Sequence, residues 1–62
     1  MEKYTLKELR ERHDLRQWQV AQQLGVSIRS YSLWEQGKRY PSLTNLRKLA
    51  EFYNVMLDAI DV

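Results

Sequence analysis

The net positive charge of this chain of 62 residues lies in its middle, and a locally basic surface can bind polyanions. Residues 15–41 carry four bases and one acid, a net charge of +3: Arg16, Arg29, Lys38, Arg39 and Glu35. Residues 42–62 carry two bases and three acids, a net charge of −1. This distribution fits a surface that faces a polyanion, and by charge alone it fits an ordinary mixed-charge surface equally well.

Catalytic and metal-binding chemistry has few candidate residues. The chain has no cysteine, and His13 is its single histidine. The carboxylates are not clustered in sequence, so neither a nucleophile–base pair nor a set of metal ligands can be recognised. We expect His13 to act as a helix-end cation or partial cap. We expect no enzyme, no cofactor, no metal site and no small-molecule ligand.

The length and composition are typical of a single domain over residues 1–62. Hydrophobic residues make up 44% of the sequence, which favours a folded domain over disorder. The longest apolar runs are two or three residues, too short to cross a membrane. The charged N-terminal segment is not a secretory signal, and the lack of cysteine suits a reducing compartment. We therefore expect a cytoplasmic protein.

Helix start and stop patterns predict an all-α fold of five helices. Thr5 and Glu8 have the spacing of a capping box, which starts the first helix. The second helix is expected over residues 17–24 and the third over residues 28–36. Gly37 follows as a left-handed residue that ends the third helix.

A fourth helix is expected to begin after Ser42 and to end at Asn54. Its core residues have helical spacing: Leu43, Leu46, Leu49 and Ala50. Residues 55–62 are short and apolar, which predicts a fifth helix of two turns or fewer. Three residues of this segment are expected to close the core: Val55, Leu57 and Ile60.

The second and third helices are expected to meet at a tight corner, as in a helix-turn-helix over about residues 17–36. Gly25 permits a left-handed turn, Val26 fills the corner and Ser27 caps the third helix. The buried side of the two helices is expected to contain Val20, Ala21, Leu24, Tyr31 and Trp34. The other side of the third helix is then left for binding.

Four segments follow one another in an order and at a spacing typical of one known family: LKELRERH, QWQVAQQLGVS, WEQGKRYPS and LTNLRKLAEFYNV. The most specific positions are Gln17, Ala21, Gly25, Glu35, Gly37, Lys38, Pro41 and Ser42. Together they resemble the lambda-repressor-like, phage repressor and Cro type of DNA-binding domain. The resemblance implies a bacterial or phage-encoded transcriptional regulator, most simply a repressor, with the helix over residues 28–36 in the major groove of double-stranded DNA. It also implies an ion pair between Arg10 and Glu35.

The same resemblance implies which side chains contact the DNA backbone. Gln17 is expected to hold one phosphate, and the loop before the fourth helix, with the start of that helix, is expected to hold others. The full set is Arg16, Gln17, Ser27, Ser30, Gln36, Lys38, Arg39, Tyr40 and Ser42. Lys38 and Arg39 have the alternative of being solvated loop charges.

Base contacts are expected from the outer face of the third helix: Ile28, Arg29, Ser32 and Leu33. Arg29 can bind guanine O6 and N7, and a phosphate contact is the alternative. The family usually has polar residues at the positions of Ile28 and Leu33. These two side chains can only contact thymine methyl groups or exclude water, which suggests that DNA shape contributes to recognition.

The apolar C-terminal segment predicts a homodimer on a palindromic operator. Its expected interface residues are Met56, Ile60 and Val62. Trp18 lies on the outer side of the second helix, either as a partial lid on the core or as part of an interface. The alternative to a DNA-binding regulator is an antitoxin-like or other protein-binding module in which DNA binding is secondary.

Overall fold

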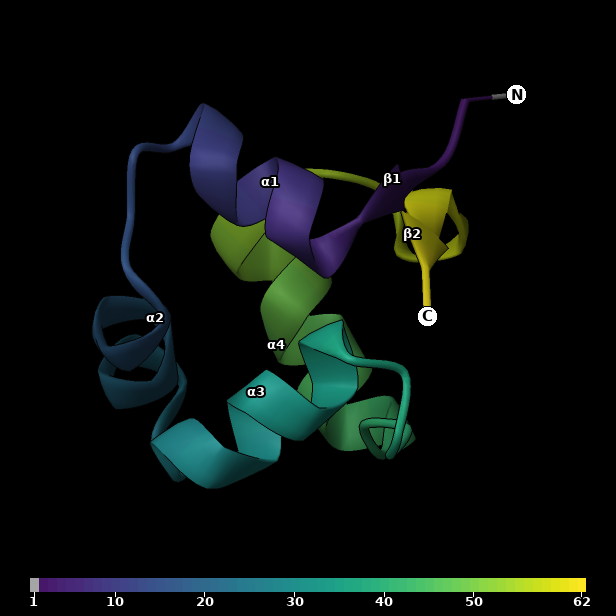
Figure 1. Cartoon of the computed structure of the whole chain (residues 1–62). Coiled ribbons are helices and arrows are strands. Elements are labelled where there is room, and N and C mark those ends of the chain that lie inside the picture. The colour runs from purple at the N-terminus through teal and green to yellow at the C-terminus, as the bar shows by residue number, and fades with distance from the viewer. Residues whose placement is uncertain (1) are drawn as a thin grey trace.

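The computed structural model describes residues 2–62, which form four α-helices around one core. The helices are α1 (Leu6–Arg12), α2 (Gln17–Leu24), α3 (Ile28–Glu35) and α4 (Leu43–Tyr53). Two short strands, β1 (Tyr4–Thr5) and β2 (Ile60–Asp61), lie at the ends of the chain, and a 3-10 turn, η1 (Leu57–Ala59), precedes β2. In Figure 1, α2 and α3 form one corner of the molecule, while β1 and β2 lie together on the opposite side.

The prediction of a fifth helix was wrong. Residues 57–59 form a single 3-10 turn, and the chain then extends into β2, which pairs in parallel with β1. Tyr4 pairs with Ile60 and Thr5 pairs with Asp61. Met56 stands at the cap position of the turn and makes no side-chain hydrogen bond there. A short segment without a cap gains little as a helix, because nucleating one is costly.

All four α-helices within residues 2–62 end in the same way. The first or second residue after each helix has a positive φ: Asp14 (55°), Gly25 (71°), Gly37 (73°) and Asn54 (57°). After α2, the Gly25 N–H donates to Gln22 O at 3.2 Å and the Val26 N–H donates to Ala21 O at 3.0 Å. This pair of bonds is a Schellman motif, and the other three helix ends have the equivalent bonds. The predicted left-handed ends at Gly25, Gly37 and Asn54 are confirmed.

Side-chain caps start three of the four α-helices in the described chain. Thr5 and Glu8 form the predicted capping box, with bonds of 2.9 and 3.1 Å. The Ser27 and Ser42 hydroxyls accept bonds from N–H groups three residues later. The Arg16 side chain has no acceptor atom, so it cannot cap α2. The start of α2 has a different contact, in which the Arg16 backbone N–H donates to Gln19 Oε1 at 2.8 Å.

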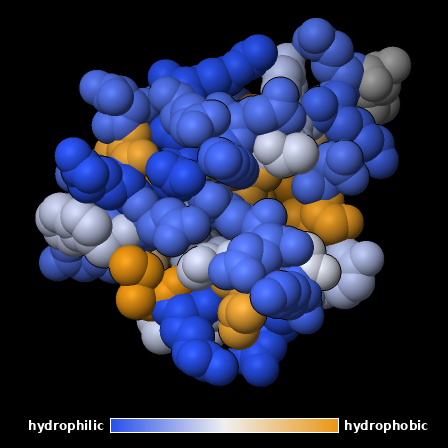
Figure 2. All heavy atoms as spheres, in the orientation of Figure 1, coloured by the Kyte–Doolittle hydropathy of each residue, from blue (hydrophilic) through white to orange (hydrophobic). Residues whose placement is uncertain are grey.

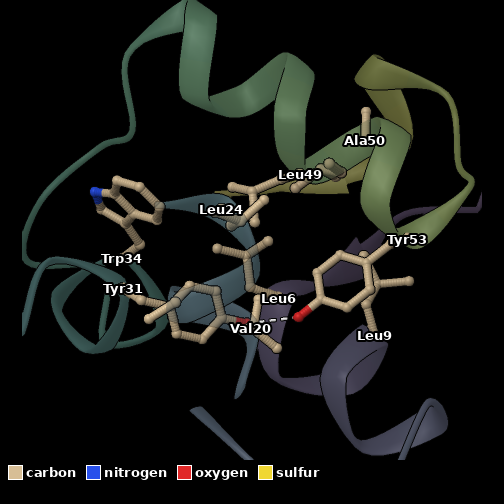
Figure 3. Packing of buried hydrophobic residues seen from close by; sticks show 11 residues of the cluster. Leu6, Leu9, Val20, Leu24, Tyr31, Trp34, Leu49, Ala50 and Tyr53 are labelled. Carbon is tan, nitrogen blue, oxygen red and sulfur yellow. Dashed lines mark hydrogen bonds between the residues drawn. The ribbon is translucent and has the colours of Figure 1, made fainter. Parts of the chain in front are cut away.

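The core lies where all four α-helices meet, and Figure 3 shows its packing. Its buried residues are Leu6, Leu9, Val20, Ala21, Leu24, Tyr31, Trp34, Leu49, Ala50, Tyr53 and Ile60. The hydroxyls of Tyr31 and Tyr53 lie 2.8 Å apart in a hydrogen bond, so the polar ends of both buried rings are satisfied. Burial raises the pKa of both phenols.

Two predictions of core residues were wrong. Leu43 is 56% exposed at the first residue of α4, and the buried residues of that helix all lie in its second half. Leu57 is 36% exposed, because the 3-10 turn does not direct it to the core. Val55 does pack against the core, and Ile60 is buried within it.

Replacing Gly25 by alanine is expected to destabilise the domain by about 1 kcal/mol, because an L-residue with a side chain disfavours left-handed geometry. A Cβ atom at this position would meet nothing within 4 Å, so the cost is one of backbone conformation alone. Gly25→Asn is the matched control, and it should lose less stability than Gly25→Ala because asparagine tolerates this geometry. Urea unfolding monitored by circular dichroism measures both. Equal losses in the two variants would contradict this explanation.

Candidate nucleic-acid interface

The helix α3 lies on the outside of the corner that it forms with α2 (Figure 1). Tyr31 and Trp34 are buried against the core, and the remaining side of the helix faces outward. We call this side the outer face of α3: Ile28, Arg29, Ser32, Leu33 and the following Gln36. Ile28, Arg29 and Gln36 are exposed, whereas Ser32 and Leu33 are half-buried. The four residues predicted to contact bases therefore lie together on one surface.

Local hydrogen bonds join polar side chains of α3 to the residues that flank the helix. The Ser27 hydroxyl accepts a bond from the Ser30 N–H at 3.0 Å and donates to the Ser30 hydroxyl at 2.9 Å. One helical turn further on, Gln36 Nε2 donates to the Ser32 hydroxyl at 2.9 Å. The Ser32 O–H and the Gln36 carbonyl oxygen keep capacity for a ligand. Ser32 was predicted to contact bases and Gln36 to contact phosphates, yet the two side chains are hydrogen-bonded to each other.

The loop between α3 and α4 adds exposed side chains next to the outer face. Lys38, Arg39 and Tyr40 are all exposed, and Tyr40 is 74% exposed. Ser42 is exposed at the start of α4, where its hydroxyl accepts a bond from the Asn45 N–H at 3.2 Å. Arg16 is exposed at the start of α2. The first N–H groups of a helix have no intrahelical partner, so helix starts suit anionic ligands.

The orientation of α3 depends on Glu35 at its last residue. The Glu35 carboxylate accepts bonds from Arg10 Nε at 2.7 Å and from Arg10 Nη2 at 3.1 Å, so the expected ion pair is present and bidentate. The Glu35 side chain is only 5% exposed, and the Arg10 side chain is 15% exposed. Arg10 Nη1 also donates to Leu15 O at 3.1 Å, which attaches the loop before α2. Bonds of this kind are stronger than neutral hydrogen bonds and have a defined geometry.

A second contact of Glu35 was missed at the level of sequence. Gln17 Nε2 donates to Glu35 Oε1 at 3.0 Å, so the amide predicted to hold a phosphate also supports the ion pair. Its carbonyl oxygen and its second N–H remain for other partners. No local pattern indicates this bond, because the two residues are 18 positions apart.

The electrostatics of Glu35 follow from these contacts. Burial by itself raises the pKa of the carboxyl group, but the bonds from Arg10 and Gln17 outweigh burial and hold the pKa below its ordinary value of 4.5. The Tyr31 hydroxyl acts in the same direction. Arg10 of α1, Gln17 of α2 and Glu35 of α3 thus belong to one polar network.

The predicted dimer-interface residues do not have equal access to a partner. Met56 is 73% exposed and Val62 is 37% exposed. Ile60 is 6% exposed, and it pairs with Tyr4 in the β1–β2 ladder. The side chain of Ile60 contributes to the core of the monomer, as also predicted, so Met56 and Val62 are the two residues of the set with side chains open to a partner.

Two further residues named by sequence analysis have defined places. His13 ends α1, and its Nδ1 lies 2.8 Å from Leu9 O, as expected of a partial cap. Trp18 is 53% exposed and borders a shallow hollow with Leu15 and Phe52, both of which pack against the core. No helix within residues 2–62 has the length and hydropathy needed to cross a membrane.

Comparison with known proteins finds the helix-turn-helix family, whose sequence model matches residues 6–60. The HTH-type transcriptional activator BcrR of Enterococcus faecalis is 40% identical over 55 residues, which are 89% of this chain and 27% of that protein. The cryptic phage CTXphi transcriptional repressor RstR of Vibrio cholerae is 40% identical over 50 residues, which are 81% of this chain and 45% of that protein. The chain thus spans less than half the length of either relative. No solved structure gives a significant match.

Acid is expected to destabilise the domain through Glu35. Because the folded-state pKa lies below the unfolded value of 4.5, the stabilisation is present above that value and is lost as the pH falls through the folded pKa. Glu35→Gln should lower stability near pH 7 by about 3 kcal/mol, because it leaves the half-buried Arg10 without its charged partner. The variant should also lose less stability than the wild type between pH 5 and pH 3.

Urea unfolding at several pH values measures this effect, and Glu51→Gln is the control because Glu51 is an exposed carboxylate on α4. The control should keep the acid dependence of the wild type. An unchanged dependence in Glu35→Gln would show that other carboxylates, such as that of Glu8 in the capping box, cause the acid sensitivity.

Proposed function

Because the chain belongs to the lambda-repressor-like helix-turn-helix family, we propose that it binds double-stranded DNA at specific sequences and regulates transcription. The observation that carries this proposal is the outer face of α3. It is held in one orientation by Glu35 and displays Arg29 in its first turn, and the loop after its last turn carries Lys38 and Arg39. A rigid exposed helix with basic neighbours can enter the major groove.

The proposed DNA contacts are of two kinds. The side chains of Ile28, Arg29, Ser32 and Leu33 face the base edges. The remaining side chains position the domain on the phosphates: Arg16, Gln17, Ser27, Ser30, Gln36, Lys38, Arg39, Tyr40 and Ser42. Gln17 binds its phosphate with the part of its amide that is not bonded to Glu35, so backbone binding and helix orientation depend on the same side chain. Contacts of the first kind give specificity, and contacts of the second kind give register and affinity.

Repression is the simplest mode of regulation for such a domain, because a bound domain of this kind can block access of polymerase to the same DNA. The two relatives are named as an activator and a repressor, so their names support regulation without choosing its direction. We propose further that two copies associate through Met56 and Val62, which are both exposed. A two-fold contact would place two α3 helices about 34 Å apart on a palindromic operator.

Arg29→Ala is expected to weaken binding to sequences selected from a random DNA pool by about 1–3 kcal/mol, because a bidentate contact to guanine is lost. Lys38→Ala should weaken binding to all sequences similarly and reduce the salt dependence by about one phosphate contact. Gel-shift titrations at several salt concentrations measure both effects. The charge-matched control is Lys7→Ala, an exposed lysine on α1, which should bind as the wild type does. Binding without sequence preference at physiological salt would contradict the proposal and favour a protein-binding module.

Met56→Asp is expected to abolish self-association and to leave the monomer folded, because the side chain is 73% exposed. Sedimentation at micromolar concentration, with and without operator DNA, measures the oligomeric state. Trp18→Gln removes another exposed apolar side chain, at 53% exposure, and should leave the association unchanged. A wild-type protein that stays monomeric and binds DNA one to one would refute the dimer.

A further inference from the structure

We propose that α3 recognises the 5-methyl group of a pyrimidine, thymine above all, in the base pair next to a guanine. This inference rests on the proposed function and specifies what its outer face reads. Its ligand is the C5-methyl group itself, so 5-methylcytosine, which carries the same group, is recognised at the same position.

The first observation is the exposure of Ile28. Its side chain is 51% exposed at the first residue of α3, and an aliphatic side chain cannot form hydrogen bonds. The partly buried hydrophobic residues that pack against the core within residues 2–62 do not include Ile28. The fold therefore does not require an isoleucine at this position.

Leu33 is the second observation. It is half-buried, and it too is absent from the described hydrophobic residues that pack against the core. It lies four residues after Arg29, so the two side chains are neighbours on the outer face of α3. A guanidinium group thus has one aliphatic neighbour in sequence, Ile28, and another one helical turn away, Leu33.

The chemistry of the major groove assigns a ligand to these aliphatic side chains. Each base pair presents hydrogen-bond donors and acceptors there, and thymine adds the C5-methyl group as an apolar contact. Arg29 suits guanine O6 and N7. Ile28 and Arg29 are consecutive residues in the first turn of α3, so both side chains start from the same end of the helix. Ile28 and Arg29 can therefore read neighbouring base pairs.

The surroundings of Ile28 favour DNA over a protein partner as the ligand. Arg29 beside Ile28, and Lys38 and Arg39 in the loop that follows α3, are exposed basic residues, which suits a polyanion. Figure 2 shows a mainly hydrophilic surface on which hydrophobic residues form small, separate areas, including at the level of α3. A stable protein interface needs a larger continuous area, whereas a single methyl group needs only one aliphatic side chain.

Replacement of thymine by deoxyuridine tests the proposal, because it removes only the 5-methyl group. The protein first selects duplexes from a random pool, and each thymine of a selected site is then replaced singly. At one thymine beside a guanine, we expect deoxyuridine to weaken binding by about fourfold, the value of one buried methyl group. Changing that thymine to cytosine should also weaken binding, and 5-methylcytosine should bind about fourfold better than cytosine.

Ile28→Ala should bring the ratio of thymine to deoxyuridine affinities close to one at this position. Leu43→Ala removes a similarly exposed leucine, at 56%, outside α3, and it should keep the wild-type ratio. If selected duplexes bind the wild type equally with thymine and deoxyuridine at every position, the proposal is overturned and sequence-specific binding stands. If no duplex is selected, the proposed function itself fails. A lack of gain from 5-methylcytosine would overturn the extension to methylated cytosine.

Discussion

A buried carboxylate is the constraint on which the rest of the structure depends. Glu35 is almost fully removed from water at the end of α3, and such a charge is costly unless it is paired and hydrogen-bonded. Arg10 on α1 and Gln17 on α2 supply those bonds, and the separate bond between Tyr31 and Tyr53 joins α3 to α4. Any displacement of α3 would break several of these bonds at once. The network therefore fixes the helix that we propose to insert into DNA.

Such a network matters more in a small domain than in a large one. Eleven hydrophobic residues are buried within residues 2–62, and the sequence has no cysteine for a disulfide that would limit the unfolded state. The four Schellman motifs contribute in the same direction, because they satisfy carbonyl groups at each helix end and set the direction of the next segment. At Gly25 this direction is the corner between α2 and α3. The sharp corner leaves one side of α3 outside the core.

Features set by neighbouring residues could be predicted from sequence, and features set by distant ones could not. The capping box at Thr5 and the left-handed ends at Gly25 and Asn54 depend on a few local residues, so their patterns sufficed. The bond from Gln17 to Glu35 and the pairing of Tyr4 with Ile60 join segments far apart in sequence. Because the strand pairing was not predicted, the segment of Ile60 was assigned to a helix, and Ile60 was assigned both to the core and to an interface. Ile28 and Arg29 were expected on the outer face of α3 from the family pattern, and both are exposed.

The two sides of α3 carry separate requirements. Tyr31, Trp34 and Glu35 face inward, where a change of volume or charge would affect the core or the ion pair. Ile28 and Arg29 face outward and make no contact that the fold needs, so substitutions there are expected to change binding with little effect on stability. Specificity can therefore vary among domains of this kind while the framework stays the same. In this chain, the outward residues combine one guanidinium group with aliphatic side chains, which suits recognition of guanine beside a methylated pyrimidine.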